Sequence, residues 1–274
     1  MAFLTVQFTS EILKVGCSLN AILPQNTANF RAAYGGPPRR PFPVLWLFHG
    51  LSDDHSAWSR QTSIERYAYE RGLAVIMPAV NRSFYTNMVA GAPYGEFIRQ
   101  ELPMIARSFF QLSEARADNF VAGLSMGGLG AFLQAMSAPE SYAAAASLSG
   151  VLDPKERIAR VRREAAEGDP AAEIFEQELG YILGDLDAIE NHPDYLPTLA
   201  GRMALRQKQG LHVPEFYACC GTEDFLYEDN LVFRRQALEL GLPLTYEEGP
   251  GGHDWVFWDR WIQRVIAWLP LKNS

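Results

Sequence analysis

The hydrophobic and polar residues of this chain follow two different periods. Residues 2–8 and 14–23 alternate with a period of two, which is typical of strands that have one covered face. Further along, short and continuous apolar runs recur, and such runs indicate strands that are buried on both faces. These runs lie near residues 44–49, 73–77, 119–123, 144–149, 214–220 and 243–247.

Apolar residues with a helical period lie between these runs. The helical segments lie near residues 60–70, 95–110, 126–138, 228–240 and 255–268. Regular alternation of buried strands and helices is typical of a parallel sheet that carries helices on both faces. The sequence therefore predicts an α/β fold with a mostly parallel central sheet, which opens with an antiparallel pair of strands.

Residues 153–210 interrupt this alternation with a charged and helix-rich segment. The segment has too few apolar residues for a core of its own, so we expect a small, lid-like helical insertion. The whole chain of 274 residues has the length of one large α/β domain. We therefore predict a single domain over residues 1–274 that contains this insertion.

Charge and composition disfavour several classes of function. The formal net charge of −8 argues against binding to nucleic acid, because the phosphates would be repelled. The three cysteines make no disulfide framework, and no pair of cysteine and histidine residues has metal-ligand spacing. We therefore expect neither a metal nor a cofactor. A basic cluster near residues 157–163 is interleaved with glutamates, which indicates a solvated helix face.

The first residues of the chain alternate like a strand and do not have the basic start and apolar core of a signal peptide. No apolar run is long enough to span a membrane. We therefore expect a cytoplasmic protein without a membrane partner. The sequence leaves open whether it assembles into a homo-oligomer.

A Gly-x-Ser-x-Gly pentapeptide spans Gly123 to Gly127, at the junction of a predicted strand and a predicted helix. This context resembles the nucleophile elbow of α/β-hydrolases, in which a sharp turn presents a serine hydroxyl above the sheet. Only residues as small as glycine fit two positions before and after such a serine. Ser125 is therefore the predicted nucleophile.

A serine hydroxyl needs an adjacent base, and a carboxylate has to orient that base. In the elbow enzymes the base follows both the serine and the acid along the chain. Three histidines follow the serine: His192, His212 and His253. Only His253 lies in a glycine-rich loop between a predicted strand and the last helix, and loops at strand ends commonly carry chemistry. We therefore predict that His253 is the base.

The acid is expected in the polar loop that follows the buried strand near residues 214–220. Four carboxylates compete for this role: Glu223, Asp224, Glu228 and Asp229. Asp224 is favoured, because Gly221 allows the turn that would aim its carboxylate at the base. Asp254 adjoins the base in sequence and is instead expected to cap the helix that begins near Trp255.

Hydrolysis of an acyl group also requires backbone N–H groups that hold the oxyanion. One is expected from Met126, the residue after the nucleophile. The second is expected from Leu51, in the loop that follows the apolar strand near residues 44–49. His49 in the same loop precedes the nucleophile, so we expect it to brace the loop and not to carry protons.

With these residues assigned, the chain resembles the esterase D-like branch of the α/β-hydrolases, and most closely the tributyrin esterases. The segments that carry the resemblance are residues 47–58, 81–87, 123–128, 220–230 and 252–258. The resemblance spans nearly the whole chain and implies the α/β-hydrolase fold and an esterase for short acyl chains. Related groups include S-formylglutathione hydrolases, feruloyl and acetylxylan esterases, and mycolyl transferases.

The sequence thus predicts a serine carboxylesterase that hydrolyses short-chain acyl esters through an acyl-enzyme, with a small-molecule ester as its substrate. Residues expected to line the substrate pocket are Trp58, Phe84, Tyr85, Leu226 and Trp255. One alternative is a thioesterase of the S-formylglutathione hydrolase type, which would use the same machinery. Another is a non-catalytic hydrolase-like scaffold, which the complete and ordered set of catalytic residues disfavours.

Overall fold

The computed structural model describes residues 1–271, and residues 272–274 of the predicted domain lie outside this range. In this range eight strands form one sheet in the order β1-β2-β4-β3-β5-β6-β7-β8. The strands are β1 (Ala2–Thr9), β2 (Gly16–Leu23), β3 (Val44–Phe48), β4 (Ala74–Pro78), β5 (Asn119–Leu124), β6 (Ala144–Leu148), β7 (Glu215–Gly221) and β8 (Leu244–Gly249).

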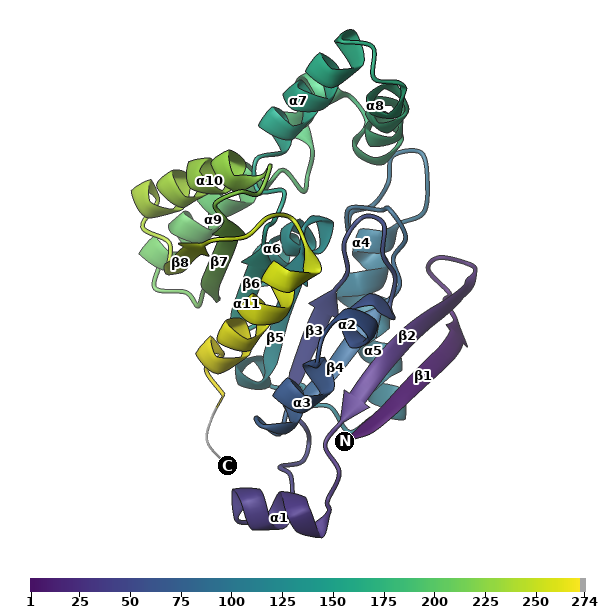
Figure 1. Ribbon diagram of the computed structural model, residues 1–274, viewed down its shortest axis with the longest axis vertical. Helices are drawn as coiled ribbons and strands as arrows, with labels where there is room; N and C mark the ends of the chain where they lie inside the picture. The colour runs from purple at the N-terminus through teal and green to yellow at the C-terminus, as the bar shows by residue number, and fades with distance from the viewer. Residues whose placement is uncertain (272–274) are drawn as a thin grey trace.

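The sheet is antiparallel at one side and parallel elsewhere. Strand β2 pairs in the antiparallel sense with both β1 and β4, and the remaining pairs of neighbours are parallel. Figure 1 shows β1 and β2 at one end of the sheet and β7 and β8 at the other. The predicted opening pair and the mostly parallel sheet are therefore confirmed.

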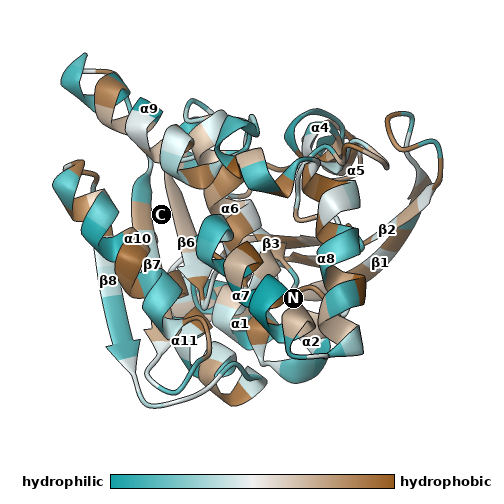
Figure 2. Cartoon of the chain, turned by 90° about the horizontal axis from the view of Figure 1, so that it is seen from above, coloured by the Kyte–Doolittle hydropathy of each residue, from teal (hydrophilic) through white to brown (hydrophobic). Residues whose placement is uncertain are grey.

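Helices cover both faces of the sheet. They are α1 (Ala28–Tyr34), α2 (Ala57–Gln61), α3 (Ile64–Tyr69), α4 (Tyr94–Glu96), α5 (Leu102–Phe109), α6 (Met126–Ser137), α7 (Pro154–Ala166), α8 (Pro170–Leu183), α9 (Leu196–Lys208), α10 (Tyr227–Glu239) and α11 (Trp255–Trp268). Short π or 3-10 turns are η1 (Phe97–Glu101), η2 (Arg116–Asp118) and η3 (Leu186–Asn191). Figure 2, viewed from above, shows more hydrophilic residues on the edge strand β8 than on the inner strands.

The side chains of β3 show how the two cores form. Val44, Trp46 and Phe48 point into one hydrophobic cluster, together with residues of α5, α6, α9 and α10. Leu45 and Leu47 point into a second cluster, with residues of α2, α3 and α11. Successive side chains of a strand face opposite sides, so a strand between two helical layers must be apolar throughout.

Two predicted helices are less regular than the sequence pattern suggests. The segment near residues 60–70 is divided into α2 and α3, because Thr62 is extended and its hydroxyl accepts a hydrogen bond from the Ile64 N–H. The segment near residues 95–110 forms α4, the π turn η1 and α5 in succession. Both differences lie within predicted helical regions and leave the order of elements unchanged.

The segment over residues 153–210 is helical, but its parts differ in position. Helices α7 and α8 pack against each other and stand above the sheet in Figure 1. Helix α9 instead packs against α6 in the layer that covers the sheet. Buried residues of all three helices, such as Val161, Leu179 and Met203, join the larger hydrophobic cluster.

Candidate active site

The turn between β5 and α6 places Ser125 in a strained conformation. Its φ of 54° lies in the left-handed region, which is uncommon for a residue other than glycine. A Cβ atom on Gly123 would lie 2.3 Å from the Gly127 carbonyl oxygen, and one on Gly127 would lie 2.6 Å from the carbonyl oxygens of Phe48 and His49. Both glycines are thus required by close backbone contacts around the serine.

Three side chains from three loops form a continuous series of hydrogen bonds. His253 Nε2 lies 2.9 Å from Ser125 Oγ, and His253 Nδ1 lies 3.0 and 2.9 Å from the two carboxylate oxygens of Asp224. An ionised carboxylate can only accept, so Nδ1 carries the proton and Nε2 is free to accept one from the serine hydroxyl. The Asp224 side chain is fully buried, whereas His253 is partly open to solvent.

Hydrogen bonds connect the loop that carries the acid to the loop that carries the base. Glu223 N–H donates to the Gly251 carbonyl oxygen at 3.2 Å, and the Gly251 N–H donates to the Glu223 carboxylate. A Cβ atom on Gly221 would lie 2.0 Å from the Gly251 carbonyl oxygen. Gly221 is therefore needed for this close approach of the two loops.

The other carboxylates near Asp224 have different partners. Asp229 is buried and accepts a hydrogen bond of 2.7 Å from Arg160 of α7. Burial raises the pKa of Asp229 to about 6, and the charge of Arg160 opposes that rise. Glu228 is exposed. Asp254 accepts from the Phe257 N–H at 2.9 Å, so the predicted cap of α11 is present.

Two backbone N–H groups are available next to the serine. In residues 1–271, neither Leu51 nor Met126 has an acceptor for its N–H. Met126 is the first residue of α6, where backbone donors have no partner within the helix. Leu51 and Met126 both line the cavity that contains Ser125.

His49 fixes the loop that carries Leu51. Its Nε2 accepts from the Val80 N–H at 3.1 Å, and its Nδ1 lies 2.7 Å from the Gly50 carbonyl oxygen. The ring is 1 % exposed, and this burial lowers the pKa of His49 to about 4. His49 is therefore neutral near pH 7 and makes two contacts with backbone, as its predicted bracing role requires.

A cavity of about 450 Å³ opens beside Ser125. Three of the predicted pocket residues, Phe84, Leu226 and Trp255, line it. The other residues around it are Gly50, Leu51, Ser52, Asp53, Leu124, Met126, Val151, Arg157, Phe175, Phe225, His253, Asp254 and Trp258. A smaller cavity of about 30 Å³ lies beneath α7 and α8 and shares Phe84, Val151 and Arg157 with the first.

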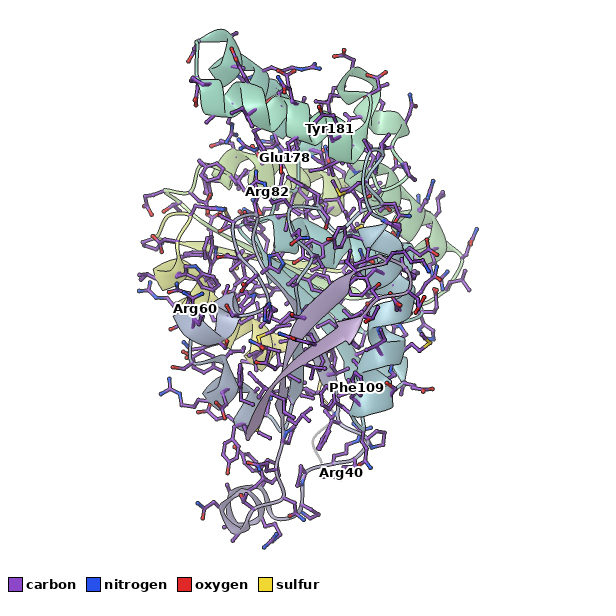
Figure 3. The ribbon with its side chains drawn as sticks, turned by 90° about the vertical axis from the view of Figure 1, so that its right-hand side faces the viewer. Arg40, Arg60, Arg82, Phe109, Glu178 and Tyr181 are labelled. Carbon is purple, nitrogen blue, oxygen red and sulfur yellow. The ribbon has the colours of Figure 1, made fainter. Side chains whose placement is uncertain are left out.

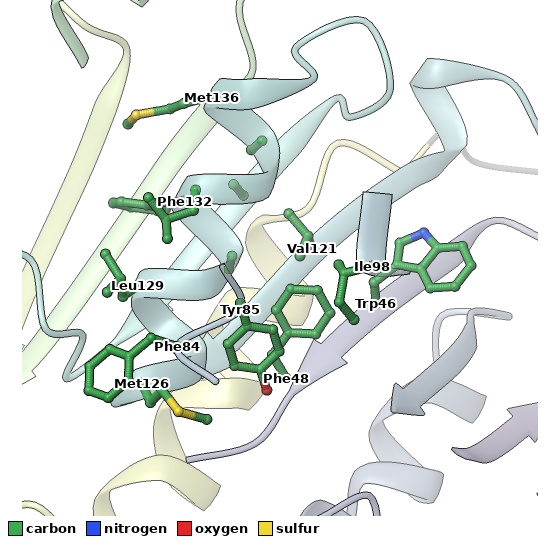
Figure 4. Close-up of a cluster of buried hydrophobic side chains, with 14 of the residues drawn as sticks. Trp46, Phe48, Phe84, Tyr85, Ile98, Val121, Met126, Leu129, Phe132 and Met136 are labelled. Atoms are coloured by element: carbon green, nitrogen blue, oxygen red, sulfur yellow. The ribbon is translucent and has the colours of Figure 1, made fainter. Parts of the chain in front are cut away.

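Trp58 and Tyr85 do not line this cavity, contrary to the prediction. Trp58 is buried, and its Nε1 donates to the Phe48 carbonyl oxygen at 2.9 Å. The Tyr85 ring stacks on Phe48 with ring centroids 4.5 Å apart, and its hydroxyl donates to the His49 carbonyl oxygen (Figure 4). Both aromatic residues therefore support the walls of the site from behind.

Several residues of the cavity were missed by the sequence interpretation. The ring centroids of Phe225 and His253 lie 4.5 Å apart. Trp258 contacts the His253 ring edge-on, with ring centroids 4.9 Å apart. Phe225 directly follows Asp224 in the sequence, so its position next to the predicted acid could have indicated that it lies in the site. Phe175 of α8 and Arg157 of α7 had no local signal, because only the fold brings these helices to the serine.

The described part of the chain offers no site for a metal, since it contains no group of three or more histidine, cysteine, aspartate or glutamate residues placed to hold an ion. None of the helices in residues 1–271 combines the length and apolar character that crossing a membrane requires. Cys219 and Cys220 are buried on β7, and neither is paired in a disulfide.

The sequence matches the model of the Esterase family, described as "Putative esterase", over residues 19–269. The chain belongs to the Esterase family. An acetyl esterase from Caldicellulosiruptor saccharolyticus is 27% identical over 270 residues, which cover 98% of each chain. The similarity therefore extends over nearly the whole length of both chains.

Two solved structures from Staphylococcus aureus are similar to this esterase. The fluorophosphonate-binding serine hydrolase FphF is 33% identical, with a TM-score of 0.83 and 99% of each chain covered. The S-formylglutathione hydrolase FrmB is also 33% identical, with a TM-score of 0.77 and coverage of 98% of this chain and 99% of that one. The predicted α/β-hydrolase fold, esterase D-like resemblance and enzyme class are therefore confirmed, and the protein is a serine carboxylic ester hydrolase.

Proposed function

We propose that this esterase hydrolyses short-chain acyl esters through an acyl-enzyme, with Ser125, His253 and Asp224 as its catalytic triad. The observation that carries the proposal is the continuous series of hydrogen bonds from the Asp224 carboxylate through the imidazole to Ser125 Oγ. Such a series activates a serine hydroxyl, which is a weak nucleophile by itself.

The reaction follows from the positions of the protons. Ser125 Oγ attacks the carbonyl carbon of the ester, and its proton passes to His253 Nε2. The imidazolium then protonates the leaving oxygen, so the alcohol departs and the acyl group stays on the serine. Water attacks the acyl-enzyme and gives its proton to His253, and the bond between the acyl carbon and Ser125 Oγ then breaks as His253 returns the proton to Oγ and the carboxylic acid leaves. Asp224 stabilises the charged imidazole in both steps.

The backbone N–H groups of Leu51 and Met126 hold the oxyanion in this mechanism. Neither group has a partner in residues 1–271, so both can donate as negative charge develops on the carbonyl oxygen. Loss of one such donor typically reduces kcat by about 10²–10³. The fixed contacts of His49 hold the Leu51 loop in place before the substrate binds.

The cavity favours a small substrate. Its volume of about 450 Å³ is near the lower end of ligand pockets, and aromatic rings from Phe84, Phe175 and Phe225 occupy its walls. Arg157 of α7 and Phe175 of α8 both line the cavity, so we include in the proposal that residues 153–210 act as a lid-like insertion within one domain over residues 1–274. Acetate and butyrate esters should react much faster than long-chain esters.

The test combines labelling and turnover. Fluorophosphonate should label the wild-type protein, and Ser125→Ala should lose both labelling and hydrolysis, with a fall in kcat on the order of 10⁶ by analogy with other triads. A matched control is Ser56→Ala, which changes a half-buried serine at the start of α2 that does not line the cavity. Labelling or more than a few per cent of activity in pure Ser125→Ala would refute the assignment.

A second candidate is a thioesterase that acts on S-formylglutathione. The 33% identity to the S-formylglutathione hydrolase FrmB over nearly the whole chain favours it. The same triad would attack a thioester, and a thiolate would leave in place of an alkoxide. The ratio of kcat/KM for S-formylglutathione to that for an oxygen ester of equal acyl length separates the two candidates.

The proposal also includes a cytoplasmic location and no nucleic-acid partner. The net charge of −8 supports the second part, because an acidic surface repels phosphates. Cell fractionation followed by fluorophosphonate labelling of each fraction tests the location directly.

A further inference from the structure

Helix α7 carries four arginines, and Arg157 differs from the rest in its partners. The other three are paired with acidic side chains: Arg160 with Asp229, Arg162 with Glu176 and Asp187, and Arg163 with Glu156. In residues 1–271 no hydrogen bond or ion pair engages the Arg157 guanidinium. The prediction of a uniformly solvated basic helix face therefore does not hold for this residue.

Arg157 is instead held between two aromatic rings. Its guanidinium carbon lies 5.2 Å from the centre of the Phe175 ring and 5.7 Å from that of the Phe225 ring. Phe225 in turn contacts the imidazole of His253. The two rings attract the cation, and the guanidinium N–H donors have no hydrogen-bond acceptor in residues 1–271.

The position of Arg157 joins it to the reaction site. Arg157, Phe175 and Phe225 line the same cavity of about 450 Å³ as Ser125. Arg157 is half-buried, and this burial lowers the pKa of the guanidinium, which nevertheless stays charged at neutral pH. The carboxylates of Glu164 and Asp229 act on the guanidinium through their charge, but neither forms an ion pair or hydrogen bond with it.

The other charged groups around the cavity are differently placed. Asp53 and Asp254 come from the loops after β3 and β8, and the Asp254 carboxylate is engaged as the cap of α11. Arg157 comes from α7 and supplies a positive charge on the side of the cavity that α7 lines. The charge around the cavity is thus divided, with carboxylates on the sheet loops and a guanidinium on the α7 side.

From this arrangement we infer that Arg157 binds a carboxylate of the substrate, so that the preferred substrates of this site are esters with an anionic group at the end remote from the reacting carbonyl. A planar guanidinium can make two parallel hydrogen bonds to a carboxylate. This inference rests on the proposed function, because it assumes that substrate occupies the cavity beside Ser125.

The anionic group can belong to the acyl part or to the alcohol part of the ester, and two pairs of substrates distinguish these cases. The acyl pair is monoethyl glutarate and its terminal amide, ethyl glutaramate. The alcohol pair is 4-acetoxybenzoate and 4-acetoxybenzamide. The quantity measured is the ratio of kcat/KM for the anionic member to that for the neutral member of each pair.

We expect the wild-type ratio to exceed one in at least one pair, and Arg157→Met to lower that ratio about tenfold, which corresponds to ~1.4 kcal/mol. Arg157→Lys should retain part of the preference, since the charge remains but the planar pair of donors is lost. If either variant fails to fold, as judged by circular dichroism, the other still provides the comparison. The preference should weaken as ionic strength rises, because a half-exposed ion pair is screened.

Arg82→Met is the matched control. The Arg82 guanidinium also lies over the Phe175 ring, at 5.8 Å, but it is paired with Glu178 and does not line the cavity. Figure 3 shows Arg82 next to Glu178, which is a residue of α8. Arg82→Met changes the net charge of the protein by the same amount as Arg157→Met. Its ratio of kcat/KM for the anionic to the neutral substrate should equal that of the wild type.

A binding measurement separates failure of this inference from failure of the proposed function. Because Ser125→Ala does not turn over substrate, NMR titration can measure how tightly it binds each of the four esters. The same dissociation constants are measured for the double variant Ser125→Ala, Arg157→Met. Hydrolysis of neutral esters without any anion preference in rate or binding would overturn the role of Arg157 and leave the esterase mechanism intact. Anion-selective binding that depends on Arg157 but without hydrolysis would support the site and contradict the mechanism.

Discussion

The buried imidazole of His49 should make the stability of this protein depend on pH in mildly acidic solution. Its pKa is lowered from the ordinary value of 6.5 to about 4, chiefly by burial. Between these values an unfolded chain carries a proton on His49 and the folded protein does not. Stability is therefore fully present above about pH 6.5 and is lost as the pH falls toward 4.

The size of this effect follows from the two pKa values. They differ by about 2.5, and each pH unit between them corresponds to ~1.4 kcal/mol of stability. The full contribution is about 3.5 kcal/mol, of which about 2 kcal/mol is lost by pH 5. Because domains of this kind are only marginally stable, a loss of this size is readily measured.

The perturbation is His49→Gln, and the assay is urea unfolding at pH 7.5 and pH 5. The free energy of unfolding of the wild type should fall by about 2 kcal/mol more than that of the variant between these conditions. His212→Gln is the control, because His212 is exposed and should leave the wild-type pH dependence unchanged. Parallel pH dependences for wild type and His49→Gln would refute the reasoning, and NMR titration of the His49 ring provides a direct check should the variant not fold.

Further predictions concern the acid and the glycines of the site. Asp224→Asn should preserve the fold but leave the imidazole in the wrong tautomer, and kcat should fall by about 10⁴. Glu223→Gln should cost far less in kcat, because its carboxylate holds a loop and does not touch the imidazole; equal losses in the two variants would contradict the assignment. Gly127→Ala should yield little folded or active enzyme, since the new methyl group would lie 2.6 Å from two carbonyl oxygens. Gly201→Ala is its control, because no atom lies within 4 Å of the added methyl group in α9, and the melting temperature should stay the same or rise.

The sequence by itself determined the order and kind of most elements and the identity of the nucleophile. Strand and helix periods are local properties, so the apolar run of β3 and the alternation of β1 were sufficient to predict an α/β sheet with an antiparallel start. The sequence signal at Ser125 is also local, because it consists of glycines two residues away on each side, although the contacts that require Gly127 come from the distant Phe48 and His49. The order of serine, acid and histidine along the chain then limited the choice of base to the histidines that follow the nucleophile.

Only the tertiary structure decided which side chains meet. Asp224 and Asp229 lie five positions apart on one loop and helix, yet one faces His253 and the other faces Arg160. Their directions depend on how the β7 loop packs against the β8 loop and how α10 packs against α7. No local pattern encodes these contacts.

The same holds for the walls of the cavity. Trp58 and Trp255 are both large and apolar, and their ring centroids lie only 5.2 Å apart, yet only Trp255 lines the cavity. Arg157 resembles the other arginines of α7 in sequence, and it differs only because the helix places it between two aromatic rings beside the serine. Residue types and periods therefore specify which elements form, whereas long-range packing determines which face of each element meets the substrate.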